Sequence, residues 1–269
     1  MLYPIGETDS QSRRLITQAQ LYNPSTRAFF QAAGISSGMR VLELGSGTGD
    51  VSLVLADLVG PSGRVVGVEL KPTAVGTARS RLSAAGWRNV EYLAGAIESA
   101  ELEQDFDAVV GRFVLMWLPD PLVVLERVVS HLRPGGVVAF QDNDFTFGAM
   151  ASAPLPLFDQ VNAWLKDTMV QDGPDYHLGL KMQHLYQRVG LTTPQFTFDA
   201  SIGTGNNWTG YQHLAETIEM LKPLMHQRGI ALPAEIATSD LAEKIRQEVV
   251  ENNAVIILPA IIGAWSRKP

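Results

Sequence analysis

The pattern of apolar and polar positions divides the chain into two halves. In the first half, short Val-rich runs without polar alternation are typical of strands that are buried on both faces of a parallel sheet. These runs lie at 40–45, 64–69, 90–93, 106–111 and 136–141. Segments with helical spacing separate them, at 50–59, 72–85 and 121–132. The third helix begins with Asp120 as its expected N-cap and Pro121 at its first position. The alternation predicts an α/β fold with a doubly wound sheet, whose ligands bind beyond the carboxyl ends of the strands.

The second half departs from strict alternation. Residues 144–190 and 201–250 carry turn-forming residues between helical patterns. The expected elements are helices near 155–170 and 178–189, two helix-like pieces within 201–250, and strands at 194–200 and 254–265. We expect a single domain over residues 1–269, in which 144–190 and 201–250 are helical lid insertions that shape a substrate pocket.

Composition restricts the classes of function. The chain has 269 residues, of which 46% are hydrophobic and 18% charged, and this balance is typical of a soluble globular protein. It has no cysteine, which excludes disulfides, cysteine nucleophiles and thiolate metal sites and fits a reducing compartment, so we expect a cytoplasmic protein. We expect neither a signal peptide nor a membrane span.

The charge of the chain argues against a nucleic-acid partner. Its net charge is −7, and its Lys and Arg residues are scattered rather than gathered on one face. Nucleic-acid binding depends on neutralising phosphates with a basic surface, so we expect a small-molecule partner instead. Oligomeric state is not encoded in any pattern that we recognise.

A glycine loop follows the first predicted strand. It reads Gly45-Ser46-Gly47-Thr48-Gly49 and opens a helix, so its backbone can approach a ligand closely. A dinucleotide motif would place its third glycine at position 50, where the chain has Asp50. Glu43, two residues before the loop, would repel a pyrophosphate but suits a ligand that carries an ammonium and a sulfonium. The loop alone therefore leaves two classes of cofactor open, a dinucleotide and a ligand that carries an ammonium and a sulfonium.

The second predicted strand ends in a carboxylate. Glu69 stands 20 positions after Gly49, the separation expected for an acid that accepts hydrogen bonds from ribose hydroxyls. Bonds of this charge-assisted kind contribute roughly 1.5–3 kcal/mol each. The alternative interpretation is that Glu69 is a solvated strand end.

These segments together resemble the class I S-adenosylmethionine-dependent methyltransferases, and among them the ubiquinone and menaquinone methyltransferase type. The resemblance rests on residues 43–49, Glu69, the fourth strand at 106–112 and the segment at 125–136. It covers about 15–142 well and implies a cofactor-binding core there. It also implies a Rossmann-like sheet of seven strands, mostly parallel, with an antiparallel last strand that 254–265 could supply.

The resemblance implies further contacts with the cofactor. Residues after the fourth strand flank the methionine part, and those after the third lie against the adenine. Ala96 stands where many members have an aspartate, so the backbone at Ile97 or the side chain of Glu98 has to replace it. The implied cofactor set is Tyr22, Glu43, Gly45, Ser46, Gly47, Thr48, Gly49, Glu69, Leu70, Ala96, Ile97, Glu98, Arg112, Phe113 and Met116. Alternatively, Arg112 is a surface charge that pairs with Asp144 or Glu43, and Tyr22 is a core residue.

Such an enzyme moves a methyl group from S-adenosylmethionine to a small acceptor and leaves S-adenosylhomocysteine. Proximity and orientation supply about 7–11 kcal/mol in reactions of this type. A general base is needed only when the acceptor must lose a proton. The weak candidates for a base are Asp142, Asp144, His177, His184 and His213. Each histidine is equally a packing or surface residue.

No metal is expected. The run Asp142-Asn143 resembles a magnesium site of catechol-type enzymes, but Arg112 places a cation where those enzymes need a carboxylate. The aromatic and methionine residues of the insertions suit a flat or apolar acceptor, or else form a core. Two other functions stay open, a non-catalytic S-adenosylmethionine-binding regulator and a nicotinamide-dependent oxidoreductase.

Overall fold

The computed structural model describes residues 9–169, 175–230 and 238–269, which form two compact units. The sheet unit comprises 23–144, 177–199 and 261–269. The helical unit comprises the described residues of 9–22, 145–176 and 200–260. Whether the two units act as the single predicted domain with lid insertions stays a prediction.

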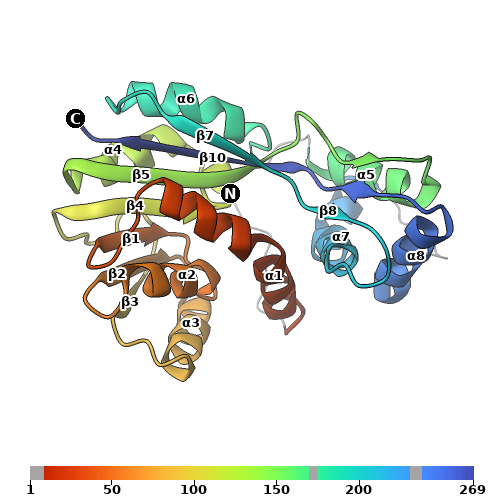
Figure 1. The fold of residues 1–269 in the computed structure, drawn as a ribbon, viewed down its shortest axis with the longest axis horizontal. Helices are drawn as coiled ribbons and strands as arrows, with labels where there is room; N and C mark the ends of the chain where they lie inside the picture. Colours follow the sequence, from red (N-terminus) through yellow and green to blue (C-terminus); the bar gives the residue numbers. More distant parts are fainter. Residues whose placement is uncertain (1–8, 170–174, 231–237) are drawn as a thin grey trace. The chain divides into compact units, whose positions relative to one another are not determined.

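A seven-stranded sheet forms the centre of the sheet unit (Figure 1). Its strands are β1 (Arg40–Leu44), β2 (Arg64–Glu69), β3 (Val90–Ala94), β4 (Phe106–Arg112), β5 (Leu132–Asp144), β7 (Gln195–Asp199) and β10 (Ala260–Arg267). They are ordered β3-β2-β1-β4-β5-β10-β7. The first five pair in parallel, and β10 is antiparallel to β7. The predicted Rossmann-like fold class is therefore confirmed.

Helices cover both faces of this sheet. They are the second part of α1 (Asp9–Ala32), α2 (Asp50–Val59), α3 (Pro72–Ala84), α4 (Pro121–Ser130) and α6 (Leu178–Arg188). Phe29 and Phe30 of α1 pack with Leu55 of α2 against buried strand residues, while α4 and α6 cover the opposite face (Figure 1). Asp120 accepts the N–H groups of Leu122 and Val123, which confirms the predicted N-cap.

The predicted strand at 254–265 is wrong as a single element. The structure has the short strand β9 (Ile256–Ile257) in the helical unit and β10 in the sheet unit. Between them, the N–H of Leu258 donates to the carbonyl of Ser201, and Pro259 has no N–H to give to a ladder. A continuous apolar run does not reveal this exchange of partners, because both strands are buried.

Two other elements differ from the sequence-based expectation. Strand β5 begins at Leu132, where a register shift between Phe106 and Ala108 allows it to pair with β4 earlier than expected. Helix α6, expected in the first insertion, packs on β5 and α4 within the sheet unit. The inserted segment 144–190 is therefore divided between the units.

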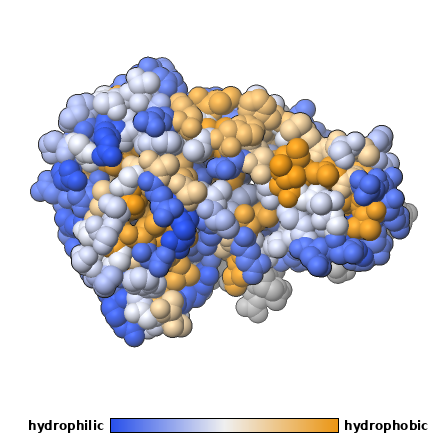
Figure 2. Space-filling model, in the orientation of Figure 1, coloured by the Kyte–Doolittle hydropathy of each residue, from blue (hydrophilic) through white to orange (hydrophobic). Residues whose placement is uncertain are grey.

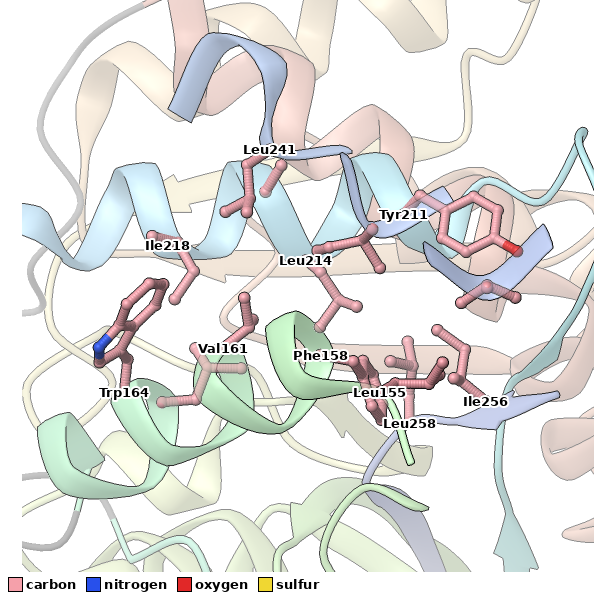
Figure 3. Close-up of a cluster of buried hydrophobic side chains, with 14 of the residues drawn as sticks. Leu155, Phe158, Val161, Trp164, Tyr211, Leu214, Ile218, Leu241, Ile256 and Leu258 are labelled. Atoms are coloured by element: carbon pink, nitrogen blue, oxygen red, sulfur yellow. The ribbon is translucent and has the colours of Figure 1, made fainter. Parts of the chain in front are cut away.

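The helical unit has its own hydrophobic core. Its elements are α5 (Pro156–Met169), α7 (Gly210–Gln227), α8 (Thr238–Glu251) and a small sheet of β6 (Met150–Ala151), β9 and β8 (Ile202–Gly203). Figure 3 shows Phe158 and Val161 of α5 pointing toward Leu214 and Ile218 of α7. Trp164 and Tyr211 belong to the same cluster. For Phe158, Trp164 and Tyr211, the structure supports a core, whereas Phe147 of the same predicted set is 49% exposed.

The surface is mixed in character. On the face drawn in Figure 2, hydrophobic side chains form separate patches among hydrophilic ones. Phe196 and Phe198, on the edge strand β7, are among the exposed apolar residues. No helix in the described part of the chain is long and apolar enough to cross a membrane.

Candidate active site

The glycine loop joins β1 to α2 and carries three left-handed glycines. Gly45, Gly47 and Gly49 have φ angles of 62°, 53° and 85°. A Cβ atom at Gly49 would lie 3.0 Å from the side chains of Leu82 and Tyr92, so a side chain there would crowd both. A Cβ atom at Gly47 would meet nothing within 4 Å. Gly47 therefore faces open space, as a backbone that contacts a ligand must.

Glu69, at the end of β2, is fixed by the backbone around it. Its Oε2 accepts the N–H of Gly47 at 2.9 Å, and its Oε1 accepts the N–H of Lys71 at 3.0 Å. A carboxylate oxygen accepts more than one hydrogen bond, so each oxygen keeps acceptor capacity. This remaining capacity is what the predicted contact with ribose hydroxyls requires. The interpretation of Glu69 as a freely solvated strand end is wrong, because its carboxylate is bonded to the loop.

Asp50 and Arg81 brace the loop, a role that the sequence analysis missed. Arg81 of α3 donates to the carbonyl of Thr48 at 2.7 Å and to Oδ1 of Asp50 at 2.6 Å. The hydroxyl of Thr48 donates to Oδ2 of Asp50 at 2.9 Å. Asp50 is 7% exposed, and a partly buried ion pair with this geometry is stronger than a surface pair. The residue that replaces a third glycine thus anchors the loop in this chain.

Glu43 lies beneath the loop and is fully enclosed. Burial raises the pKa of its carboxyl group to about 8, although a hydrogen bond from Ser52 and the charge of Arg112 both lower it. The Oγ of Ser52 lies 2.5 Å from Oε2 of Glu43. At pH 7 this carboxyl group is therefore mainly protonated. The sequence analysis expected a negative charge on Glu43. The carboxyl group carries that charge only after it loses its proton, which its raised pKa opposes.

Arg112 ends β4 and points into the protein. It is 8% exposed, and its Nη1 donates to Oδ1 of Asn23 and Oγ1 of Thr26, both at 2.9 Å. The interpretation of Arg112 as a surface charge is therefore wrong. The next residue, Phe113, has a φ of 56°, which is strained for a residue with a side chain. Met116, 3% exposed, follows in the short helix η1 (Leu115–Trp117).

The turn after β3 lies beside Glu69. The N–H of Gly95 donates to the backbone carbonyl of Glu69 at 2.9 Å, and a Cβ atom at Gly95 would meet nothing within 4 Å. Ala96 is half-buried, Ile97 is buried and Glu98 is exposed. Leu70, beside Glu69, is 59% exposed. The structure thus brings the third-strand turn and the carboxylate together, while the predicted adenine contacts of Ala96, Ile97 and Glu98 stay predictions.

Asp142 and Asp144 are both fully buried at the end of β5. Oδ2 of Asp144 accepts the N–H of Leu180, in the first turn of α6, and its Oδ1 is 3.9 Å from Nδ1 of His177. The contact with Leu180 gives Asp144 a structural role at the start of that helix. His177 and His184 are exposed on the sheet unit.

His213 lies in the helical unit, on α7, where its ring meets that of Tyr22 edge to face with centroids 5.6 Å apart. Tyr22 is 6% exposed. Burial and the positive charge of Arg14 lower the pKa of His213 to about 3. A general base works best when its pKa lies near the working pH, so a pKa this low makes His213 a poor proton acceptor.

Gln141 is a second residue that sequence reasoning passed over. It is fully buried on β5, and neither atom of its amide has a hydrogen-bond partner in the described part of the chain. The register of the sheet sets it beside Arg112, so both side chains leave the same face. A buried amide without partners is costly, so this position calls for a polar partner, either a water molecule or a ligand. The signal in the sequence is a polar residue that directly follows an apolar strand core.

The described residues contain no group of three or more His, Asp or Glu side chains that could hold a metal ion.

Comparisons with known proteins agree on one family. A family model described as a methyltransferase domain matches residues 35–216. A demethylmenaquinone methyltransferase of Lactococcus lactis subsp. lactis is 35% identical over 179 residues, which cover 61% of this chain and 69% of that protein. An aklanonic acid methyltransferase of Streptomyces sp. is 28% identical over 54% of this chain and 73% of its own length.

A solved structure gives the same fold. The crystal structure of a SAM-dependent methyltransferase from Aquifex aeolicus aligns with a TM-score of 0.55 and 14% identity, over 98% of this chain and 100% of that one. At this identity the likeness shows the fold alone. The family match covers more than half of the chain and agrees with the glycine loop, Glu69 and the seven-stranded sheet, so the chain belongs to the S-adenosylmethionine-dependent methyltransferases.

Proposed function

We propose that this protein transfers the methyl group of S-adenosylmethionine to a small-molecule acceptor, and that the cofactor lies along the glycine loop, Glu69 and Gly95. The observation that carries the placement is Glu69, whose carboxylate is held by two backbone N–H groups and keeps acceptor capacity on both oxygens. The names of the two relatives support a small acceptor, since one names demethylmenaquinone and the other aklanonic acid.

The residues present fit this cofactor. Gly47 and Gly95 face open space on either side of Glu69, which leaves room for a nucleoside against the backbone. Arg81 and Asp50 hold the loop before any ligand arrives, so little ordering is needed on binding. When bound, S-adenosylmethionine supplies a methyl group on a sulfonium that needs no further activation.

The chain's own residues then have to bind the cofactor and align it with the acceptor. Glu69 binds the ribose hydroxyls, and the buried Arg112 fixes the end of β4 against α1 through Asn23 and Thr26. Gln141, with its unsatisfied amide on the same face, contacts the reactants and orients the acceptor. Alignment of this kind supplies about 7–11 kcal/mol in reactions of this type.

Two measurements test the proposal. Calorimetric titration with S-adenosylhomocysteine should give a single site, and no heat at millimolar ligand with folded protein would contradict the cofactor assignment. Transfer of labelled methyl from S-adenosylmethionine should then be followed over a panel of demethylated quinones, phenols and aromatic acids. Binding without transfer to any acceptor of this panel would contradict the proposed acceptor class.

A further inference from the structure

The two edges of the central sheet differ in character. Strand β3, at one edge, carries Glu91, an exposed carboxylate that pairs with Arg64. Strand β7, at the other edge, carries Phe196 and Phe198, which are 42% and 56% exposed. An edge strand presents backbone groups that can pair with another chain, and proteins usually protect such strands with charges, prolines or bulges. The centre of β7, Phe196-Thr197-Phe198, contains neither a charge nor a proline.

The register with β10 shows where the side chains of β7 lie. Phe198 is opposite Ile262 and Phe196 is opposite Ala264, so both rings are on one face of the sheet. A Cβ atom at Gly179 of α6 would lie 2.7 Å from the side chain of Ile262, so this is the face that α6 covers (Figure 1). The apolar layer under α6 therefore continues to the edge of the sheet, where the two rings are exposed.

The sequence of β7 is complementary to itself. The strand reads Gln195-Phe196-Thr197-Phe198-Asp199. A two-fold axis through Thr197 sets a second copy of the strand antiparallel to the first. Gln195 then lies opposite Asp199 of the partner subunit, and Phe196 lies opposite Phe198 of the partner subunit. Aromatic pairs across antiparallel strands are favourable, and an amide can donate to a carboxylate. The two Asp199 carboxylates lie at opposite ends of the paired strands, so like charges do not meet.

We propose that this protein forms a two-fold dimer in which the β7 strands of two copies pair antiparallel about Thr197. The occupant of the exposed edge is thus a second copy of this chain. Identical surfaces that face each other across a two-fold axis are the commonest arrangement of protein dimers. The contact goes beyond the proposed function, because β10 and β5 separate β7 from the strands β4, β1 and β2 that carry the proposed cofactor residues.

The size of the contact predicts a weak dimer. A buried phenylalanine covers about 150–250 Å², so the exposed parts of four rings supply roughly 400 Å². Obligate homodimers bury about 2,000 Å² or more. The backbone of five paired residues on each copy adds to the rings but does not bring the contact to that size. We therefore expect a dimer that dissociates at micromolar concentrations.

Sedimentation of the full chain between about 1 μM and 1 mM tests for this dimer. The wild type should move from a mass of 29.3 kDa to twice that mass as its concentration rises. Phe196→Glu should dissociate at least tenfold more readily, because pairing would bury a carboxylate against Phe198 of the partner subunit. The control Val123→Glu, at a 52% exposed site on α4, should behave as the wild type. A wild type that keeps the monomer mass at every concentration would overturn the proposal.

Paired cysteine substitutions test the register of the strands. The chain has no cysteine, so each substitution introduces a single thiol. Positions 195 and 199 lie opposite each other in the proposed dimer, and opposite residues have Cα atoms about 4.5–5.5 Å apart, within reach of a disulfide. A mixture of Gln195→Cys and Asp199→Cys should therefore form a linked dimer on mild oxidation. Each variant alone should not, because its two thiols lie about 14 Å apart along the paired strands.

Equal cross-linking of each variant alone and of the mixture would contradict this register, as would the absence of cross-linking from a mixture whose wild type dimerises. Titration with S-adenosylhomocysteine separates the dimer from the cofactor site. Phe196→Glu should bind S-adenosylhomocysteine within twofold of the wild-type affinity. Loss of binding in Phe196→Glu alone would indicate a damaged fold, and the cysteine pair then decides the proposal. Failure of the wild type to bind would contradict the proposed function, while sedimentation would still test the dimer.

Discussion

Replacement of Glu69 by glutamine removes one carboxylate oxygen and leaves the shape of the side chain unchanged. In the wild type, Oε2 accepts from Gly47 and Oε1 from Lys71, so both oxygens are already oriented. The amide keeps one acceptor and turns the other into a donor. The new NH2 group faces either a backbone N–H or a ribose hydroxyl. The charge-assisted hydrogen bond that the carboxylate oxygen made at that position is then lost.

The magnitude follows from these contacts. Loss of one charge-assisted hydrogen bond costs about 1.5–3 kcal/mol, which corresponds to roughly 10- to 150-fold weaker binding of S-adenosylhomocysteine. The folded state loses a smaller amount, about 1 kcal/mol, because Glu69 is only half-buried and water can partly satisfy the freed N–H group. Binding should therefore fall much more than stability.

Calorimetry with S-adenosylhomocysteine and urea unfolding measure the two effects separately. Glu91→Gln is the matched control, since Glu91 is an exposed carboxylate of the neighbouring strand β3, paired with Arg64 on the surface. The control should change neither quantity by more than about 1 kcal/mol. A dissociation constant for folded Glu69→Gln within twofold of the wild-type value would refute the assignment of Glu69 to the ribose.

Three other predictions follow from the same site. Arg81→Met should raise the KM for S-adenosylmethionine about tenfold and change kcat little, because it frees the loop rather than the reacting atoms, whereas the surface control Arg88→Met should leave both constants unchanged. Burial raises the pKa of Glu43 to about 8 from 4.5, so the folded chain keeps a proton that the unfolded chain loses, and stability falls as pH rises through that window. Glu43→Gln should remove this fall, on the order of a few kcal/mol at most, and equal pH dependence of urea unfolding in both proteins at pH 5.5 and 8.5 would contradict it. Gln141→Leu should raise the melting temperature and lower the rate of methyl transfer, while unchanged transfer would show that its amide does not meet the reactants.

The sequence by itself determined the parallel strands, the glycine loop after the first of them and the carboxylate that ends the second. Buried strands lack polar alternation, and Gly45, Gly47 and Gly49 stand where the backbone needs left-handed angles. The separation of Glu69 from the loop follows from the length of one strand-helix-strand unit, so counting along the chain finds it. These are local properties, and a local pattern is enough to predict them.

Tertiary structure decided the groups that brace and complete the site. Arg81 reaches Asp50 across 31 positions, and Arg112 reaches Asn23 across 89, so neither contact leaves a periodic trace. The same holds for Tyr22 and His213, whose rings meet because α1 and α7 contribute to one unit. Apolar residues can be placed inside by their periodicity, but the partner of a buried charge depends on which elements pack together. That choice is made by the whole fold, and only the folded chain reveals it.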